Sequence, residues 1–294
     1  MNRSFSRVLG GVALAVSLVA GGMGTAGAQS LGSSVPPLPD PAPKSCAPNI
    51  LVSVPGGANT VSNAPSNLPL GLYTRTVGAQ LRHSTGGRVV DRYASYNSLP
   101  GGFRTYEQVR QDAYNSTRNL LARSASECPN AKFSLLGYSL GSDISSLLVR
   151  DIAAGRGPIS AEHLTSAVLI ANPNRGVPGV EQQGTAPQHT AGAFGALPGG
   201  YGSLNNRVVD VCRQGDIVCD TPANLSPVAG EAAKTALLSF QSNLGPAAAS
   251  LGRLNPIDQL TAVPTFILGS QIHIDYDAIN ATGIATEYIR TRLA

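Results

Sequence analysis

Residues 132–154 read KFSLLGYSLGSDISSLLVRDIAA, and the change of pattern within this stretch predicts the fold. The apolar run Lys132–Tyr138 predicts a buried strand, and Ser142–Ala154 predicts a helix ended by the glycine that follows. Between them, Gly137-Tyr138-Ser139-Leu140-Gly141 fits the pattern G-x-S-x-G. A serine on a sharp turn between a strand and a helix is typical of a nucleophile, and flanking glycines let the two elements approach closely. Ser139 is therefore the candidate nucleophile; the alternative is a chance match in a chain rich in glycine and serine.

Strands and helices alternate on both sides of this motif. We expect strands at 49–54, 88–93, 132–138, 164–171 and 208–212, and helices at about 67–84, 105–126 and 142–154. The second helix has Thr105 at its cap position and Glu107 in its first turn. This alternation predicts the α/β class, with a central, mostly parallel sheet of about five strands flanked by helices.

Two stretches interrupt the alternation. Residues 173–205 are rich in Gly, Ala and Pro and are predicted to form a loop. Residues 222–262 are predicted to be a largely helical insertion, a candidate lid. The strand-like run Pro264–Gly269 follows that insertion.

The N-terminus has the pattern of an export signal. Arg3 and Arg7 precede the apolar run Val8–Gly22, and Ala26-Gly27-Ala28 fits a cleavage site. The run is shorter than the roughly 20 residues of a membrane-spanning helix, although an uncleaved anchor is the alternative. We therefore predict a signal peptide at 1–28, a Pro-rich leader at 29–44, and one domain at 45–294.

Composition limits the classes of partner. Apolar residues make up 42% of the 294-residue chain, charged residues 13%, and the formal charge is +4. Disorder requires low hydrophobicity with high net charge, and this chain has neither. A dedicated nucleic-acid binder requires clustered basic residues, and the sequence has no Lys/Arg tract of five or more residues. We therefore expect a folded, exported or wall-associated protein with no nucleic-acid partner.

Four cysteines follow the predicted signal, at positions 46, 128, 212 and 219. An even number of cysteines in an exported chain predicts two disulfides, because the compartment outside the membrane is oxidising. Three pairings are open in principle. Cys212 and Cys219 are close enough to close one loop, which leaves Cys46 with Cys128. A zinc site would need closer cysteine pairs or nearby histidines, and the sequence has neither, so disulfides are expected instead.

A serine nucleophile needs a base, and His273 is the best candidate among four histidines. It follows the strand-like run at 264–269, where the sheet is expected to end, and loops at strand ends gather catalytic groups. The other histidines are assigned to an exposed helix (His83), to the residue before a strand (His163) and to the 173–205 loop (His189).

The acid that orients the base is predicted between the serine and the histidine in sequence. Asp216 lies between Cys212 and Cys219, where a disulfide would hold a carboxylate in place. Asp220 is the alternative, whereas Asp275 and Asp277 are too near His273 in sequence to be first choices.

The donors to a developing oxyanion are predicted at two places. One is the amide of Leu140, at the positive end of the predicted helix. The other is the Gly-Gly turn after the first strand, with the backbone amides of Gly56 and Gly57.

These residues together resemble the cutinase family of secreted serine esterases, particularly its actinobacterial cutinase-like members. The resemblance covers about 45–220 and 271–293. Its landmarks are Cys46, Cys128-Pro129-Asn130-Ala131, the motif at 137–141, the box Gly215-Asp216-Ile217-Val218-Cys219, and His273-Ile274-Asp275-Tyr276. It implies an α/β-hydrolase fold and disulfides Cys46–Cys128 and Cys212–Cys219. It also implies Ser139 as nucleophile, Asp216 as acid and His273 as base.

The chain departs from the family at two points. Leu140 stands where the family usually has Gln, and far more chain separates Asp216 from His273 than in compact cutinases. The extra length matches the predicted insertion at 222–262.

We therefore expect an exported serine esterase that cleaves carboxylic esters through a covalent acyl-enzyme, without a metal or organic cofactor. The expected substrate is a lipophilic ester, and the expected protein is a monomer that associates with the cell envelope. Two alternatives stay open: an acyltransferase acting on envelope lipids, and a non-catalytic lipid- or wall-binding protein.

Overall fold

The computed structural model describes residues 46–98, 104–222, 230 and 252–294, all within the second of two compact units, residues 41–294. The predicted signal peptide (1–28) and leader (29–44) lie outside the described residues. So does most of the predicted insertion at 222–262.

The core of this unit is a six-stranded sheet with the order β2-β1-β3-β4-β6-β5. Every neighbouring pair of strands is parallel. The strands are β1 (Asn49–Val54), β2 (Val89–Tyr93), β3 (Lys132–Tyr138), β4 (Leu164–Ile170), β5 (Glu181–Gly184) and β6 (Val208–Cys212). The α/β class and the five predicted strands are confirmed, and β5 is a sixth strand at the edge.

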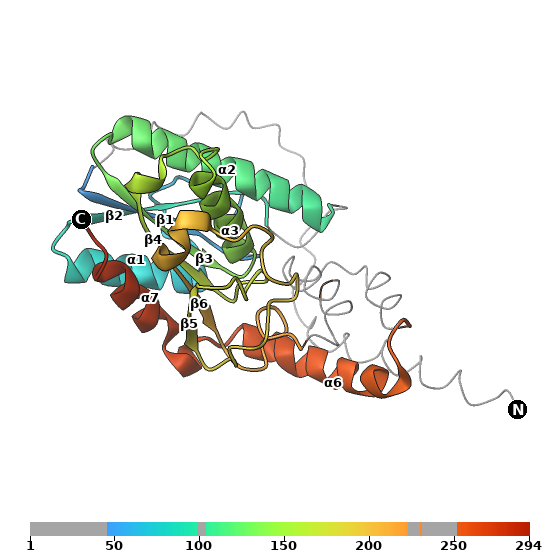
Figure 1. Cartoon of the computed structure of the whole chain (residues 1–294). Coiled ribbons are helices and arrows are strands. Elements are labelled where there is room, and N and C mark those ends of the chain that lie inside the picture. Colours follow the sequence, from blue (N-terminus) through green and yellow to red (C-terminus); the bar gives the residue numbers. More distant parts are fainter. Residues whose placement is uncertain (1–45, 99–103, 223–229, 231–251) are drawn as a thin grey trace, which may run out of the picture. The chain divides into compact units, whose positions relative to one another are not determined.

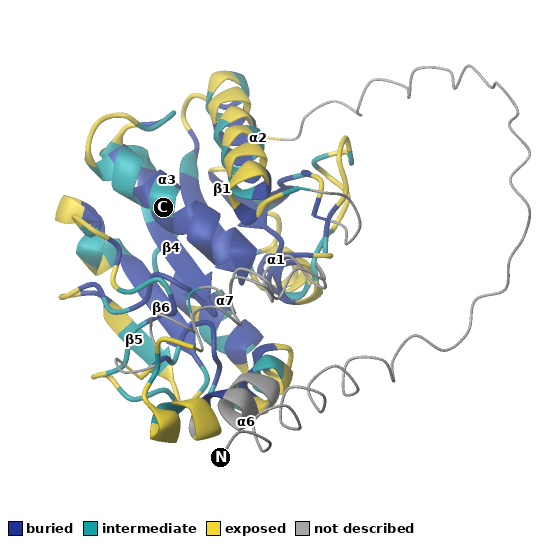
Figure 2. Cartoon of the chain, turned by 90° about the vertical axis from the view of Figure 1, so that its right-hand side faces the viewer, coloured by how far each residue is buried: buried dark blue, intermediate teal, exposed yellow. Residues whose placement is uncertain are grey.

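Helices cover both faces of the sheet (Figure 1). On one face lie α1 (Leu72–Ser84) and α7 (Ala281–Arg290), and on the other lie α2 (Tyr106–Glu127) and α3 (Leu140–Ala153). Alternate residues of β1 therefore enter different cores: Leu51 packs with α1 and α7, whereas Ile50 and Val52 pack with α2 and α3. Figure 2 shows the buried strands and the exposed outer face of α2, whereas α3 has no exposed residue.

The predicted start of α2 is confirmed. The Thr105 side chain accepts a hydrogen bond from the Gln108 amide at 3.2 Å, and the Gln108 side chain accepts one from the Thr105 amide at 2.9 Å. This reciprocal capping box satisfies two amides that the helix itself leaves unpaired. Short 3-10 helices also occur, as η2 (Ala161–His163), η3 (Gly202–Arg207) and η5 (Asp277–Ile279).

Two predictions from the sequence are wrong. Pro264–Gly269 is not a strand but part of α6 (Pro256–His273), a helix capped by Asn255 and begun by Pro256. The interval 173–205 is not only loop, because it contains β5 and the start of η3. A short apolar run has the same appearance in a strand and in a buried helix, and β5 (EQQG) lacks apolar residues because it is an exposed edge. Among the helices that the structure describes, none is long and apolar enough to cross a membrane.

Candidate active site

Ser139 lies on the turn between β3 and α3, in a backbone conformation that few residues adopt. Its φ is 59° and its ψ is −122°, in the positive-φ region that is strained for a residue with a side chain. The turn is held from both sides: the Ser139 amide donates to the Ile170 carbonyl at 2.9 Å, and the Ser139 carbonyl accepts from the Ser142 amide at 2.9 Å. The strained turn is thus tied to β4 and to the first turn of α3.

The glycines on either side of Ser139 are required by close packing. A Cβ atom on Gly141 would lie 1.9 Å from the carbonyl oxygen of Val54, at the end of β1. A Cβ atom on Gly137 would lie 2.4 Å from the Gly141 carbonyl oxygen. Only glycine lets the strand, the turn and the helix pack this closely.

His273 is the last residue of α6, and its imidazole lies within hydrogen-bonding distance of Ser139. The Nε2 atom lies 2.8 Å from the Ser139 Oγ, and the histidine is only 6% exposed. Its ring stacks on Tyr138 at 17° between planes, and the Tyr138 hydroxyl donates to the His273 carbonyl at 2.8 Å. One turn earlier, Gly269 packs against the loop that carries Asp216, where an added Cβ would lie 2.8 Å from the Ile217 Cβ and 2.9 Å from the Gly215 carbonyl oxygen. The prediction that His273 follows a strand is wrong, although the structure brings this histidine to Ser139.

Asp216 completes the line of side chains. Both of its carboxylate oxygens lie 3.0 Å from Nδ1 of His273. The Val218 amide donates to one oxygen at 2.9 Å, and the Tyr276 hydroxyl donates to the other at 2.6 Å. The residue is completely buried, so these donors replace water around its charge.

The alternatives to these residues lie elsewhere. The side chain of Asp220 accepts from the Gly215 amide at 2.7 Å and so supports the loop that carries Asp216. Asp275 pairs with Arg213 at 2.6 Å on the surface, and Asp277 begins η5. His83 and His189 are exposed, and His163 bonds to Ser160 beside β4.

The predicted oxyanion donors adjoin the turn. Leu140 is the first residue of α3 and is buried. Gly56 packs directly on the turn, since a Cβ atom there would lie 3.1 Å from the Ser139 Cβ. Gly57 is the next residue of the same turn, and its carbonyl accepts from the Asn59 side chain at 2.6 Å.

Both predicted disulfides are confirmed, and no cysteine is free. Cys46–Cys128 joins the segment before β1 to the residue that caps the C-terminus of α2. Cys212–Cys219 closes the loop that contains Asp216.

Three tyrosines with no role predicted from the sequence lie around His273, namely Tyr73, Tyr138 and Tyr276. Tyr73 donates to the Ile274 carbonyl at 2.7 Å and accepts from the Tyr276 amide at 2.8 Å. Burial, together with the nearby Asp216 charge, raises the pKa of Tyr138 and of Tyr276 well above the usual value, so both hydroxyls stay protonated donors. A tyrosine three residues after the candidate base was the available signal for Tyr276.

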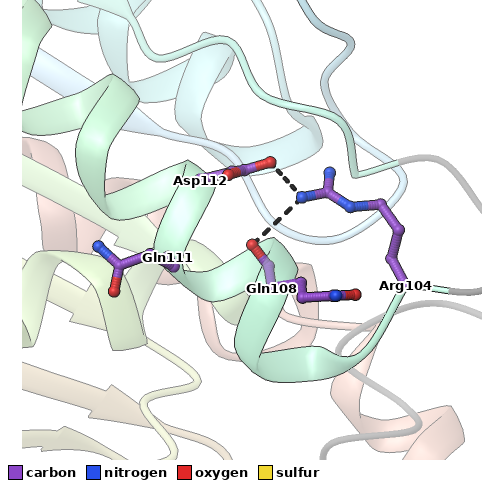
Figure 3. Close-up of a pocket in the computed structure, with 4 residues that line it drawn as sticks. All are labelled: Arg104, Gln108, Gln111 and Asp112. Atoms are coloured by element: carbon purple, nitrogen blue, oxygen red, sulfur yellow. Dashed lines mark hydrogen bonds and ion pairs between the residues drawn. The ribbon is translucent and has the colours of Figure 1, made fainter.

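Other features of the described residues lie apart from this constellation. A surface hollow at the start of α2 is lined by Arg104, Gln108, Gln111 and Asp112, and Arg104 bonds across it to Asp112 (Figure 3). None of the candidate catalytic side chains lines it. Within the described ranges, no cluster of three His, Cys, Asp or Glu residues could hold a metal ion.

Several known proteins are similar to parts of this chain. The Carboxylesterase Culp6 homolog of Corynebacterium glutamicum is 29% identical over 158 residues, covering 47% of this chain and 50% of that protein. Cutinase CUT1 of Coprinopsis cinerea is 30% identical over 110 residues, covering 37% of this chain and 43% of that protein. The chain thus matches about half the length of these curated relatives or less.

Among solved structures, the catalytic core domain of acetyl xylan esterase from Trichoderma reesei matches with a TM-score of 0.48 at 19% identity, covering 67% of this chain and 98% of that one. The sequence model of the Cutinase family matches residues 58–236, which include the serine motif and the Asp216 loop. The chain belongs to the cutinase family.

Proposed function

We propose that this protein is an exported serine esterase that hydrolyses carboxylic esters of lipophilic acids through an acyl-enzyme on Ser139. One observation carries the proposal: Ser139 Oγ, His273 and Asp216 form an unbroken hydrogen-bonded line, with distances of 2.8 Å and 3.0 Å. This is the geometry that general-base activation of a hydroxyl requires.

The proposed reaction follows from the roles of these groups. Ser139 Oγ attacks the ester carbonyl carbon while Nε2 of His273 accepts the hydroxyl proton. His273 then gives that proton to the leaving alcohol, and the acyl group stays on Ser139. A water molecule, deprotonated by His273, attacks the acyl carbon, releases the acid and restores the serine hydroxyl. Asp216 holds the imidazole in the required tautomer and stabilises its cation.

We assign the oxyanion donors to backbone amides. The Leu140 amide lies at the N-terminus of α3, where the helix dipole favours negative charge. The turn at Gly56 packs on Ser139, which supports a second donor from Gly56 or Gly57. Backbone donors do not depend on the side chain at position 140, so the leucine there is compatible with catalysis.

The distribution of exposed apolar residues supports a lipophilic substrate. Exposed large apolar side chains of the described residues occur on two segments, 61–72 and 257–274: Val61, Leu68, Leu72, Ile257, Leu260, Leu268 and Ile274. The second segment ends at Ile274, next to His273, and Tyr73, the residue after the first segment, donates to the Ile274 carbonyl at 2.7 Å. An exposed apolar residue next to the base favours an acyl chain lying along this surface, and exposed apolar surface in general favours a lipid-rich setting such as the cell envelope. The two disulfides support export.

The test is fluorophosphonate labelling of protein secreted from an expression host, with mass spectrometry to locate the adduct. We expect an adduct on Ser139 that is lost in His273→Ala, and hydrolysis of aryl esters that increases from acetyl to longer acyl chains. Absence of both labelling and turnover in folded, oxidised protein would refute the esterase proposal. A peak of activity at acetyl would refute the lipophilic substrate, and product esters formed from an added alcohol would indicate acyl transfer.

A further inference from the structure

We propose that Tyr276 is a positioning residue that holds the Asp216 carboxylate in the orientation in which it binds His273. The same contact limits the strength of the carboxylate as a hydrogen-bond acceptor. This inference rests on the proposed function, because it concerns the same three side chains.

Each oxygen of Asp216 faces His273 on one side and a separate donor on the other. One oxygen accepts from the Val218 amide at 2.9 Å, and that amide belongs to the same short loop. The second oxygen accepts from Tyr276, the shortest of these bonds at 2.6 Å. Without the tyrosine hydroxyl, the described residues would offer this oxygen of a fully buried carboxylate one donor, the histidine, because Cys219 Sγ, 3.4 Å away, belongs to a disulfide and carries no hydrogen.

Tyr276 is itself held rigidly. Its amide donates to the Tyr73 hydroxyl at 2.8 Å, and its own hydroxyl also accepts from the Arg213 amide at 3.3 Å. Its ring makes edge contacts with Tyr73 and Tyr138 and is completely buried. Because burial beside Asp216 raises the pKa of this tyrosine, the hydroxyl remains a donor throughout the neutral range.

The contact has two consequences for the reaction. A carboxylate fixed on both oxygens cannot rotate, so Nδ1 of His273 stays aligned while Nε2 reaches Ser139. A carboxylate that shares its charge with the tyrosine is a weaker acceptor for the histidine proton. Removal of the hydroxyl should therefore strengthen the hydrogen bond from His273 to Asp216. It should also leave the orientation of the carboxylate less fixed.

The test compares Tyr276→Phe with Tyr114→Phe. Tyr114 donates to Asp151 at the same 2.6 Å, between α2 and α3, so the control loses the same kind of bond far from Ser139. For Tyr276→Phe, we expect kcat on an aryl ester to fall roughly ten-fold with KM within about two-fold, the effect of losing one hydrogen bond to a charged group. The low-field proton resonance of His273 Nδ1 should move downfield. Tyr114→Phe should match the wild type in both measurements.

Equal kcat values in the two variants, or an unchanged Nδ1 resonance in folded Tyr276→Phe, would overturn the inference. The resonance does not depend on turnover. A wild type that neither labels nor hydrolyses esters would refute the proposed function, whereas the shift of the resonance would still decide the role of Tyr276.

Discussion

Asp210 gives the sharpest test of the electrostatics of this fold. It lies on β6, completely buried, with one oxygen accepting from the Asn172 side chain at 2.7 Å. Among the described residues, its second oxygen has no hydrogen-bond partner. Burial raises the pKa of Asp210 from 3.8 to about 7, although Asn172 and Arg175 act in the opposite direction.

The sign of the pH dependence follows from proton binding. Between these two pKa values the native state holds a proton that the unfolded chain has lost, so the free energy of unfolding decreases as pH rises. The stabilisation is complete below the unfolded pKa and is lost as pH rises through the folded pKa. A shift of about three units corresponds to roughly 4 kcal/mol between pH 4 and pH 8.

Asp210→Asn keeps the acceptor for Asn172 and removes the titration. We expect the difference in unfolding free energy between the variant and the wild type to change by about 4 kcal/mol from pH 4 to pH 8, in favour of the variant at high pH. Any constant cost of the buried amide cancels in this difference. Urea unfolding followed by far-UV circular dichroism measures it, with Asp112→Asn, an exposed carboxylate, as the control. Parallel stability curves for wild type and Asp210→Asn would refute the reasoning.

The other predictions concern the disulfides and the serine turn. Replacing Cys46 and Cys128 by alanines opens a loop spanning 82 residues, which should lower the free energy of unfolding by about 4 kcal/mol with little change in kcat. Replacing Cys212 and Cys219 opens a span of seven residues, which should cost only about 2 kcal/mol. The second change should nevertheless lower kcat strongly, because that loop holds Asp216. Urea unfolding measures the two stabilities, and ester hydrolysis measures the two kcat values. Full kcat in the variant without Cys212–Cys219 would contradict the prediction. Gly141→Ala places a Cβ 1.9 Å from the Val54 carbonyl, so it should destabilise the fold by roughly 3 kcal/mol and reduce fluorophosphonate labelling. A melting temperature and a labelling rate of Gly141→Ala that both equal those of the wild type would exclude the close contact between residue 141 and Val54.

The strands between the two edges of the sheet were predictable because most of their residues are apolar and both of their faces are buried. Residues 49–54, 132–138 and 208–212 have the predicted bounds, and the glycines around Ser139 marked the turn between strand and helix. The edge strand β5 was not predictable from apolar pattern, since its four residues are exposed or half-buried.

The mistaken strand at 264–269 has a different cause. Pro264 argues against a helix interior, and an apolar run is compatible with either element. The helix instead begins at Pro256, directly after Asn255, whose side chain caps it. The place of Tyr276, three residues after His273, marked it as a neighbour of the base, but its contact with Asp216 joins residues 60 positions apart and could not be predicted from a local pattern.

The packing of Gly269 on the Asp216 loop has a consequence for how this protein can vary. His273 is fastened where it acts, by Gly269 before it and by the hydrogen bonds of Tyr138 and Tyr73 around it. These contacts, all among described residues close to the histidine, hold the base against Ser139 and Asp216. The first turns of α6, before Gly269, should therefore tolerate changes of sequence while the three side chains of the site keep their geometry.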